Sequence, residues 1–188
     1  MKKVLLLMAA AVMSVSITFA QADDKAAKKA AKEAAKALKA EIKAANKTLR
    51  EAQGQLNAAD GNIDQANSLI EAAIANKHTA SNPDTWYTAG KIQEKIYNKE
   101  NEKMYLQQAY DQAKFFGSLS KMFDYFLTCD SLEQIPDEKG KVIAKYRPEM
   151  TELLSRIRIN LVSGGVTYFN ENNNEKAFEL FGKFIDVS

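Results

Sequence analysis

The chain has 188 residues, of which 46% are hydrophobic and 27% charged, with 26 basic residues against 24 acidic ones. It contains one cysteine and one histidine, which excludes an intrachain disulfide and the usual Cys/His zinc sites. A net charge this close to zero gives no reason to expect nucleic-acid binding.

The first twenty residues predict a secretory signal peptide. Lys2 and Lys3 precede an apolar run over residues 4–17, and small residues follow, ending in Ala20 before Gln21. The apolar run is too short for a stable membrane span, and no cysteine follows that could carry a lipid anchor. We therefore predict a periplasmic or secreted protein. Cleavage at this point leaves 24 basic and 24 acidic residues.

Residues 21–57 predict one long helix rich in alanine and lysine. Its apolar positions recur at steps of three and four, as in a narrow coiled-coil seam: Ala31, Ala34, Leu38, Ile42, Ala45, Leu49, Ala52 and Leu56. Lysines occupy the other faces, and residues 23–51 hold nine basic and five acidic residues. A basic helix suggests a membrane surface, but its apolar face is mostly alanine and lacks Trp or Phe. We expect a solvated helix that docks through residues 38–56.

A turn at residues 60–62 precedes a second predicted helix, over 63–76. Asp60, Asn62, Asp64 and Glu71 also have the spacing of a calcium loop. Because Gln65 stands where an EF-hand needs glycine, we favour a helix cap and turn over a calcium site. Gly54 and Ala66 lie twelve residues apart and predict a close crossing of the two helices.

Residues 82–84 predict a boundary, and residues 100–132 beyond it are rich in aromatic side chains. Their rings recur at helical spacing, which favours a packed core over a platform for stacking sugars or peptides: Tyr105, Tyr110, Phe115, Phe116, Phe123, Tyr125 and Phe126. We expect a break between two helices near Gly117 and Ser118. Cys129 is interpreted as a small packing residue, and no spacing links it to His78 as a nucleophile–base couple.

Residues 133–147 predict an exposed loop, with a short hairpin arm at Val142 and Ile143 as an option. Functional contacts are often carried by loops on a rigid scaffold, which makes this loop a candidate for a specific contact, although a plain connector is favoured. Pro148 suits the first turn of a further helix, whose apolar stripe runs on to Tyr168.

The last stretch, residues 161–186, carries a recognisable motif. Leu161, Gly165 and Tyr168 precede Ala177 and Phe181 at the spacing W-x2-L-G-x2-Y…A-x3-F, with a polar turn at 170–174 between two apolar helices. We expect Gly165 to meet Ala177 where the two helices cross. Trp86, Ala89 and Gly90 match the start of the same pattern.

These motifs make the chain similar to tetratricopeptide repeat (TPR) proteins. The end of the leader (residues 18–21), the Ala/Lys-rich helix and the segment 82–87 further resemble the secreted TPR proteins of Bacteroidetes bacteria. The resemblance implies antiparallel helix pairs stacked as a right-handed solenoid, whose first helices line a concave groove. It places the following residues in that groove: Tyr87, Lys91, Glu94, Val162, Val166, Phe169 and Asn170. Val162 and Val166 stand where the family's carboxylate clamp has asparagine, so we expect an apolar helix or an extended segment as ligand.

The sequence as a whole predicts an all-α protein: a leader (1–20), an Ala/Lys-rich helix (21–57) and a TPR-like domain (58–188), the latter as the front part of a longer array. We expect a non-enzymatic scaffold of the cell envelope that binds a protein or peptide partner, with no cofactor and no metal. Two alternatives stay open. The first is a structural module that self-assembles through the N-terminal helix, and the second is a glycan- or lipid-associated binding protein.

Overall fold

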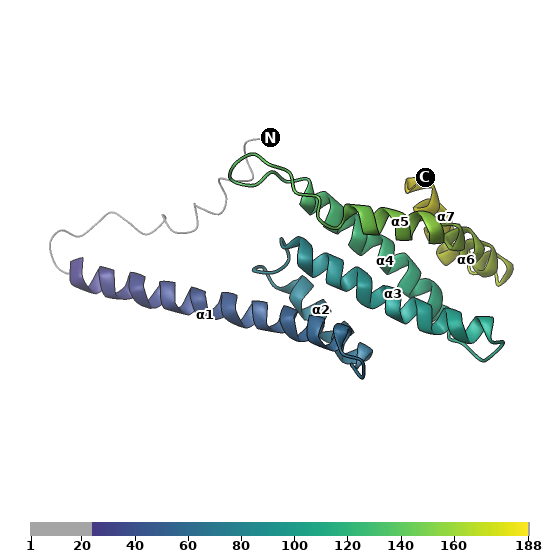
Figure 1. The fold of residues 1–188 in the computed structure, drawn as a ribbon, viewed down its shortest axis with the longest axis horizontal. Helices are drawn as coiled ribbons and strands as arrows, with labels where there is room; N and C mark the ends of the chain where they lie inside the picture. The colour runs from purple at the N-terminus through teal and green to yellow at the C-terminus, as the bar shows by residue number, and fades with distance from the viewer. Residues whose placement is uncertain (1–23, 188) are drawn as a thin grey trace. The chain divides into compact units, whose positions relative to one another are not determined.

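The computed structural model describes residues 24–187, which fold into helices without any strand in this range (Figure 1). The helices are α1 (Asp24–Asn57), α2 (Ile63–Ala75), α3 (Pro83–Tyr105), α4 (Gln112–Glu133), α5 (Arg147–Ile157), α6 (Ile159–Asn170) and α7 (Asn174–Asp186). The all-α class is thus confirmed, whereas the predicted leader, residues 1–20, lies outside the described residues.

The chain divides into two compact units, and the boundary falls inside α1, after Ala40. Of the first unit, the structure describes residues 24–40, a single helix whose side chains are exposed from Lys28 onward. The second unit begins at Glu41 and contains the end of α1 together with α2 to α7. No helix among the described residues combines the length and the apolar character that crossing a membrane requires.

Four of the helices begin with a side-chain cap, given by Asn62 for α2, Asn82 for α3, Asp111 for α4 and Asn173 for α7. The Oδ1 atom of Asn62 accepts the N–H of Gln65 at 3.0 Å, which satisfies one of the unpaired donors of the first turn. The cap expected for the turn at 60–62 is confirmed. Pro83 follows the Asn82 cap, where its fixed φ suits the start of a helix.

Two hydrophobic cores organise the second unit, and α3 contributes to both. The first core joins the end of α1 to α2 and to one face of α3: Leu49, Ala52, Leu56, Ala66, Ile70, Ala73, Ala89, Ile92 and Ile96. The second joins Tyr97 of α3 to α4 and the C-terminal helices, and it includes Phe115, Phe116, Phe123, Phe126, Met150, Leu161, Tyr168 and Leu180. Since α3 is buried on two sides, it connects the N-terminal helices to the C-terminal ones.

The predicted break at Gly117 and Ser118 is wrong. Helix α4 runs through both residues, and the break lies earlier, at residues 106–111, where Gln107 adopts a left-handed φ of 57°. A Cβ added at Gly117 would meet nothing within 4 Å, so this glycine serves neither a turn nor a close approach. A single glycine inside a helix is tolerated at a cost of about 1 kcal/mol. For this reason Gly117 by itself does not indicate the end of a helix.

The predicted helix from Pro148 to Tyr168 is present but interrupted at Arg158, which separates α5 from α6. Arg158 keeps helical φ and ψ angles of −54° and −31°, and its carbonyl accepts the N–H of Leu161 at 3.0 Å. This bond spans three residues and tightens the turn locally. The loop before α5 spans residues 134–146, and the structure contains no strand at Val142 or Ile143.

Two glycines of the TPR-like motifs lie against aromatic rings. A Cβ at Gly90 would stand 2.3 Å from Cε1 of Phe126, and one at Gly165 would stand 2.4 Å from Cε1 of Phe181. The expected partner of Gly165 was Ala177, so the close approach is real but the nearest neighbour is one helical turn further along α7. The expected contact at Gly54 is wrong, because a Cβ there would meet nothing within 4 Å.

The aromatic side chains of the central region are core residues, as expected. Phe115, Phe116, Phe123 and Phe126 are buried, and Tyr110 and Tyr125 pack against the two cores. Tyr105 is the exception, with 85% of its surface exposed at the end of α3.

Candidate functional site

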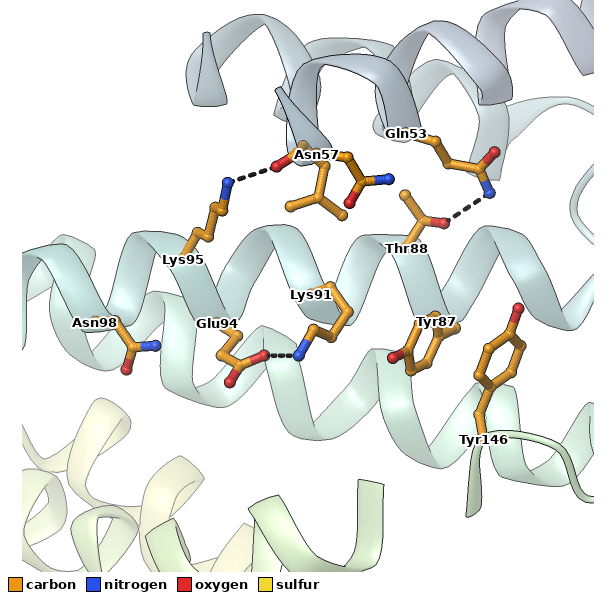
Figure 2. A pocket seen from close by; sticks show the side chains of 10 residues that line it. Gln53, Asn57, Tyr87, Thr88, Lys91, Glu94, Lys95, Asn98 and Tyr146 are labelled. Atoms are coloured by element: carbon orange, nitrogen blue, oxygen red, sulfur yellow. Dashed lines mark hydrogen bonds and ion pairs between the residues drawn. The ribbon is translucent and has the colours of Figure 1, made fainter. Parts of the chain in front are cut away.

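A cavity of about 530 Å³ opens between the end of α1 and α3 (Figure 2). Its lining is mostly polar and consists of Gln53, Leu56, Asn57, Tyr87, Thr88, Lys91, Glu94, Lys95, Asn98 and Tyr146. Six of these residues come from α3, three from α1, and Tyr146 comes from the loop before α5.

Helical spacing explains why α3 supplies so much of the lining. Tyr87, Lys91, Glu94 and Asn98 follow one another at steps of four, three and four, which places them along a single face. The opposite side of α3 carries Ala89, Ile92 and other core residues. Because one face of α3 is held in the core, the polar face is presented to the cavity.

The charge of Lys91 is balanced within the site. Its Nζ atom forms an ion pair with Glu94 on its own helix and lies 3.0 Å from Oε1 of Glu149 on α5. Burial works to lower the pKa of Lys91, but the two carboxylates outweigh it and raise that pKa above its ordinary value. The Glu149 pKa is lowered, chiefly by the hydrogen bond from Tyr87 and then by Lys91. The charge of Lys91 in the cavity is therefore fully paired.

Tyr87 and Tyr146 form a stacked pair at the edge of the cavity. Their ring centroids lie 3.8 Å apart with an interplanar angle of 10°. The Tyr87 hydroxyl donates to Oε2 of Glu149 at 2.6 Å, and the Tyr146 hydroxyl donates to Oδ1 of Asp84 at 2.6 Å. Burial, reinforced by these carboxylates, raises the pKa of both tyrosines, so both are neutral donors at pH 7.

Hydrogen bonds to two carboxylates of α4 hold the end of the loop, at Tyr146, in place. The backbone N–H of Tyr146 donates to the carboxylate of Glu133, at 2.9 and 3.2 Å from its two oxygens. Arg147 forms a bidentate pair with Asp130, with N–O distances of 2.6 and 2.9 Å. These bonds fix the position from which Tyr146 reaches Tyr87.

The end of α1 forms the cavity wall opposite Tyr87 and Tyr146. Lys95 donates from Nζ to the carbonyl of Leu56, one of the last carbonyls of α1, which no residue of that helix can satisfy. Gln53 donates from Nε2 to Oγ1 of Thr88 at 3.2 Å. The side-chain amides of Asn57 and Asn98 form no hydrogen bond with any residue in the described range and stay available at the cavity.

The structure brings together three of the seven residues expected in the groove. Tyr87, Lys91 and Glu94 line the cavity. The other four belong to α6, and none of them lines it: Val162, Val166, Phe169 and Asn170. Val166 and Phe169 are 47% and 58% exposed and continue a stripe that begins at Ile159.

Several lining residues were missed. Gln53, Asn57 and Lys95 belong to helices whose mutual placement depends on long-range packing. Asn98 could have been found, because it continues the step pattern of Lys91 and Glu94 by one turn. Tyr146 lies in the loop that the sequence singled out, but nothing local indicates its contact with Tyr87, 59 residues earlier.

Cys129 and His78 have separate surroundings. Cys129 is fully buried and its thiol donates to the carbonyl of Pro83 at 3.4 Å, and burial raises the pKa of this thiol to about 12. His78 lies with Nε2 3.4 Å from Oε2 of Glu41. Within residues 24–187 no group of three or more His, Cys, Asp or Glu side chains is placed to hold a metal ion.

Comparisons with known proteins leave the family open. No protein-family model, no curated protein and no solved structure matched the chain.

Proposed function

We propose that the protein is a non-enzymatic helical-repeat scaffold of the cell envelope that binds an extended segment of a protein partner in the cavity between α1 and α3. The observation that carries the proposal is the lining of this cavity. Three of its residues, Tyr87, Lys91 and Glu94, are those that the resemblance to TPR proteins places in the ligand groove.

The chemistry of the lining favours a peptide main chain. Asn57 and Asn98 offer free amides, each with donors and an acceptor, and these match the N–H and C=O groups of an extended peptide. Lys91 is already paired with Glu94 and Glu149, so a strongly anionic ligand gains little there. Because the charge of Lys91 is already paired, an uncharged peptide segment that forms hydrogen bonds fits the cavity best.

Additional contacts would come from α6. Val166 and Phe169 are exposed apolar residues on a helix that otherwise packs against α7, and they suit apolar side chains of the same partner. In this scheme three helix pairs stack as a short solenoid: the end of α1 with α2, α3 with α4, and α5–α6 with α7. The position of α3 in both cores is what such stacking of neighbouring pairs requires.

A sugar-stacking function at this site is less well supported. One face of the Tyr146 ring is covered by Tyr87, and Lys145 places its Nζ atom 4.3 Å from the same ring. Tyr87 in turn lies between Tyr146 and Phe126, whose ring centroid is 6.0 Å away. With these faces occupied, the pair is a structural clamp rather than a platform for a glycan.

The test is a peptide-display selection on the chain from Gln21 to Ser188, followed by affinity measurements on the variant Asn57→Ala, Asn98→Ala. We expect selected peptides to bind this variant at least about tenfold more weakly, since each lost hydrogen bond is worth about 1 kcal/mol. The matched control is Asn101→Ala, which changes the same residue type on α3 away from the cavity lining.

A second variant, Val166→Lys with Phe169→Lys, tests the contribution of α6. Weaker binding with unchanged helicity would support a groove that extends to this helix. Equal affinity of the selected peptides for the wild type and for both variants would contradict the proposed site.

A further inference from the structure

The first half of α1 is strongly basic. Residues 24–40 contain six lysines and two acidic residues, which gives a net charge of +4. Every side chain from Lys28 to Ala44 is exposed. The cavity between α1 and α3 lies further along the chain and does not use this segment.

The lysines are concentrated on one face. Lys29, Lys32, Lys36 and Lys39 follow one another at steps of three, four and three, so on an α-helix they form one line. At a rise of 1.5 Å per residue this line is roughly 15 Å long, with a charge about every 5 Å. The remaining positions are mostly alanine, which adds no competing side chain.

This arrangement works against the stability of the helix in the absence of a partner. Like charges three and four residues apart destabilise a helix by about 0.2–0.5 kcal/mol per pair. Glu33 is the one acidic residue between Lys29 and Lys39, and none of these four lysines forms an ion pair with another residue in the described range. An anion lying along the line would remove the repulsion.

The other residues of the segment indicate which class of anionic ligand fits the lysine line. Single-stranded nucleic acids stack their bases on aromatic side chains of the protein. Residues 24–40 contain no aromatic residue, which argues against such a ligand. Leu38 is the one large apolar residue in this range and the rest of its face is alanine, so the segment offers little apolar surface to bury in lipid. A linear polymer with regularly spaced negative charges meets neither objection.

We propose that the exposed half of α1 binds an acidic polysaccharide, which lies along the helix and pairs its carboxylate or sulfate groups with Lys29, Lys32, Lys36 and Lys39. The binding is electrostatic, depends on salt and is independent of the cavity. It also stabilises the helix, because it neutralises the line of like charges. This function is separate from the peptide binding proposed above, and a test of one does not depend on the outcome of the other.

The experiment measures binding of the chain from Gln21 to Ser188 to heparin and to a polyuronate at several salt concentrations, with helicity followed by circular dichroism. We expect affinity to fall as salt rises, with a logarithmic slope of roughly −3 for four contacts. Replacing the four lysines by glutamine should weaken binding at least about tenfold and abolish the gain in helicity.

Two controls separate the lysine line from net charge. The variant Lys77→Gln, Lys99→Gln, Lys139→Gln, Lys141→Gln removes the same charge from exposed positions elsewhere and should bind normally. Exchanging Lys36 with Ala34 and Lys39 with Ala37 keeps the composition but rotates two lysines by about 160°, away from the face of Lys29 and Lys32. This exchange should weaken binding by at least about threefold, since it breaks the line.

The following results would overturn the proposal: no binding to either polysaccharide, equal binding by the four-lysine variant, or equal binding after the two exchanges. Tighter binding to vesicles of anionic phospholipid, or to single-stranded DNA, than to both polysaccharides would also overturn it, in favour of a membrane or a nucleic acid.

Discussion

At the scale of single residues, the packing of α3 against α4 depends on Gly90. Its Cα faces the ring of Phe126, a fully buried side chain of α4, and a Cβ would stand 2.3 Å from that ring. The ring cannot turn away freely, because Phe126 is also surrounded by the second core. A glycine is therefore required at this position for a packing reason, although its helical backbone would accept any residue.

Replacing Gly90 by alanine should destabilise the protein by about 1–3 kcal/mol, since the core must shift to admit one methyl group. The matched control is Gly117→Ala in α4, where the added Cβ meets nothing within 4 Å. There we expect a gain of up to about 1 kcal/mol from helix propensity. Urea unfolding of both variants measures the difference. A stabilised Gly90→Ala protein would contradict the packing described here.

At the scale of elements, two buried carboxylates hold successive helices together. Glu100, near the end of α3, accepts the N–H of Asp111 at 2.9 Å, and this bond joins α3 to the N-cap of α4. It also pairs with Lys103 of its own helix at 2.7 Å. Glu133, at the end of α4, accepts the N–H of Tyr146. Both glutamates occupy positions that composition alone would assign to solvent, because charged residues are seldom fully buried.

Glu100 gives a prediction on pH. The side chain of Lys103 and the N–H of Asp111 lower the pKa of Glu100 below its ordinary value. Its contribution to stability is therefore present above the unfolded-state pKa of about 4.3 and is lost as pH falls through the folded-state pKa. Glu100→Gln should cost about 1 kcal/mol at pH 7 and progressively less below pH 4. Chemical unfolding at pH 7 and pH 3 tests this, and a cost that is constant with pH would contradict it.

The loop anchor gives a prediction on dynamics. Tyr146→Ala removes the stacking on Tyr87 and the hydrogen bond to Asp84, so amide hydrogen exchange in residues 134–146 should accelerate about tenfold or more, corresponding to a local loss of about 1–2 kcal/mol. Exchange in α3 and α4 should change little. Ile135→Ala, at a residue that is 63% exposed in the same loop, serves as the control. Unchanged exchange in the Tyr146 variant would show that the stack does not order the loop.

At the scale of the whole molecule, the division inside α1 separates a unit that contains both cores from a unit of which a single helix is described. Residues 41–187 contain both cores, whereas residues 28–40 bury no side chain. An isolated helix of this length is only marginally stable in water, so we expect residues 24–40 to add little stability of their own.

Deleting residues 21–40 should leave the midpoint of thermal unfolding within about 2 °C of the value for residues 21–188, because no core residue is lost. The helical signal in circular dichroism should fall by no more than the share of the missing residues. Thermal unfolding of the two proteins measures this. A fall of the midpoint by about 10 °C or more would contradict this, because it would mean that residues 21–40 stabilise the rest of the chain.

The sequence by itself determined which segments are helical and where most of them begin, because these signals are local. Asn62, and Asn82 with Pro83, cap their helices within three residues of chain, and the 3.6-residue period identifies buried faces such as that of Phe115 to Phe126. Of the cavity lining, the resemblance to TPR proteins indicated Tyr87, Lys91 and Glu94, whereas the 3.6-residue period by itself did not. Where local signals were ambiguous, as at Gly117, the prediction failed.

Only the tertiary structure decided which of these faces meet. Gly165 lies nearest to Phe181 rather than Ala177, Tyr146 stacks on Tyr87 from 59 residues away, and Val166 and Phe169 lie apart from the cavity lining. Such contacts depend on the rotation and offset of whole helices. Many side chains set these together, and the 3.6-residue period of any one helix leaves them undetermined.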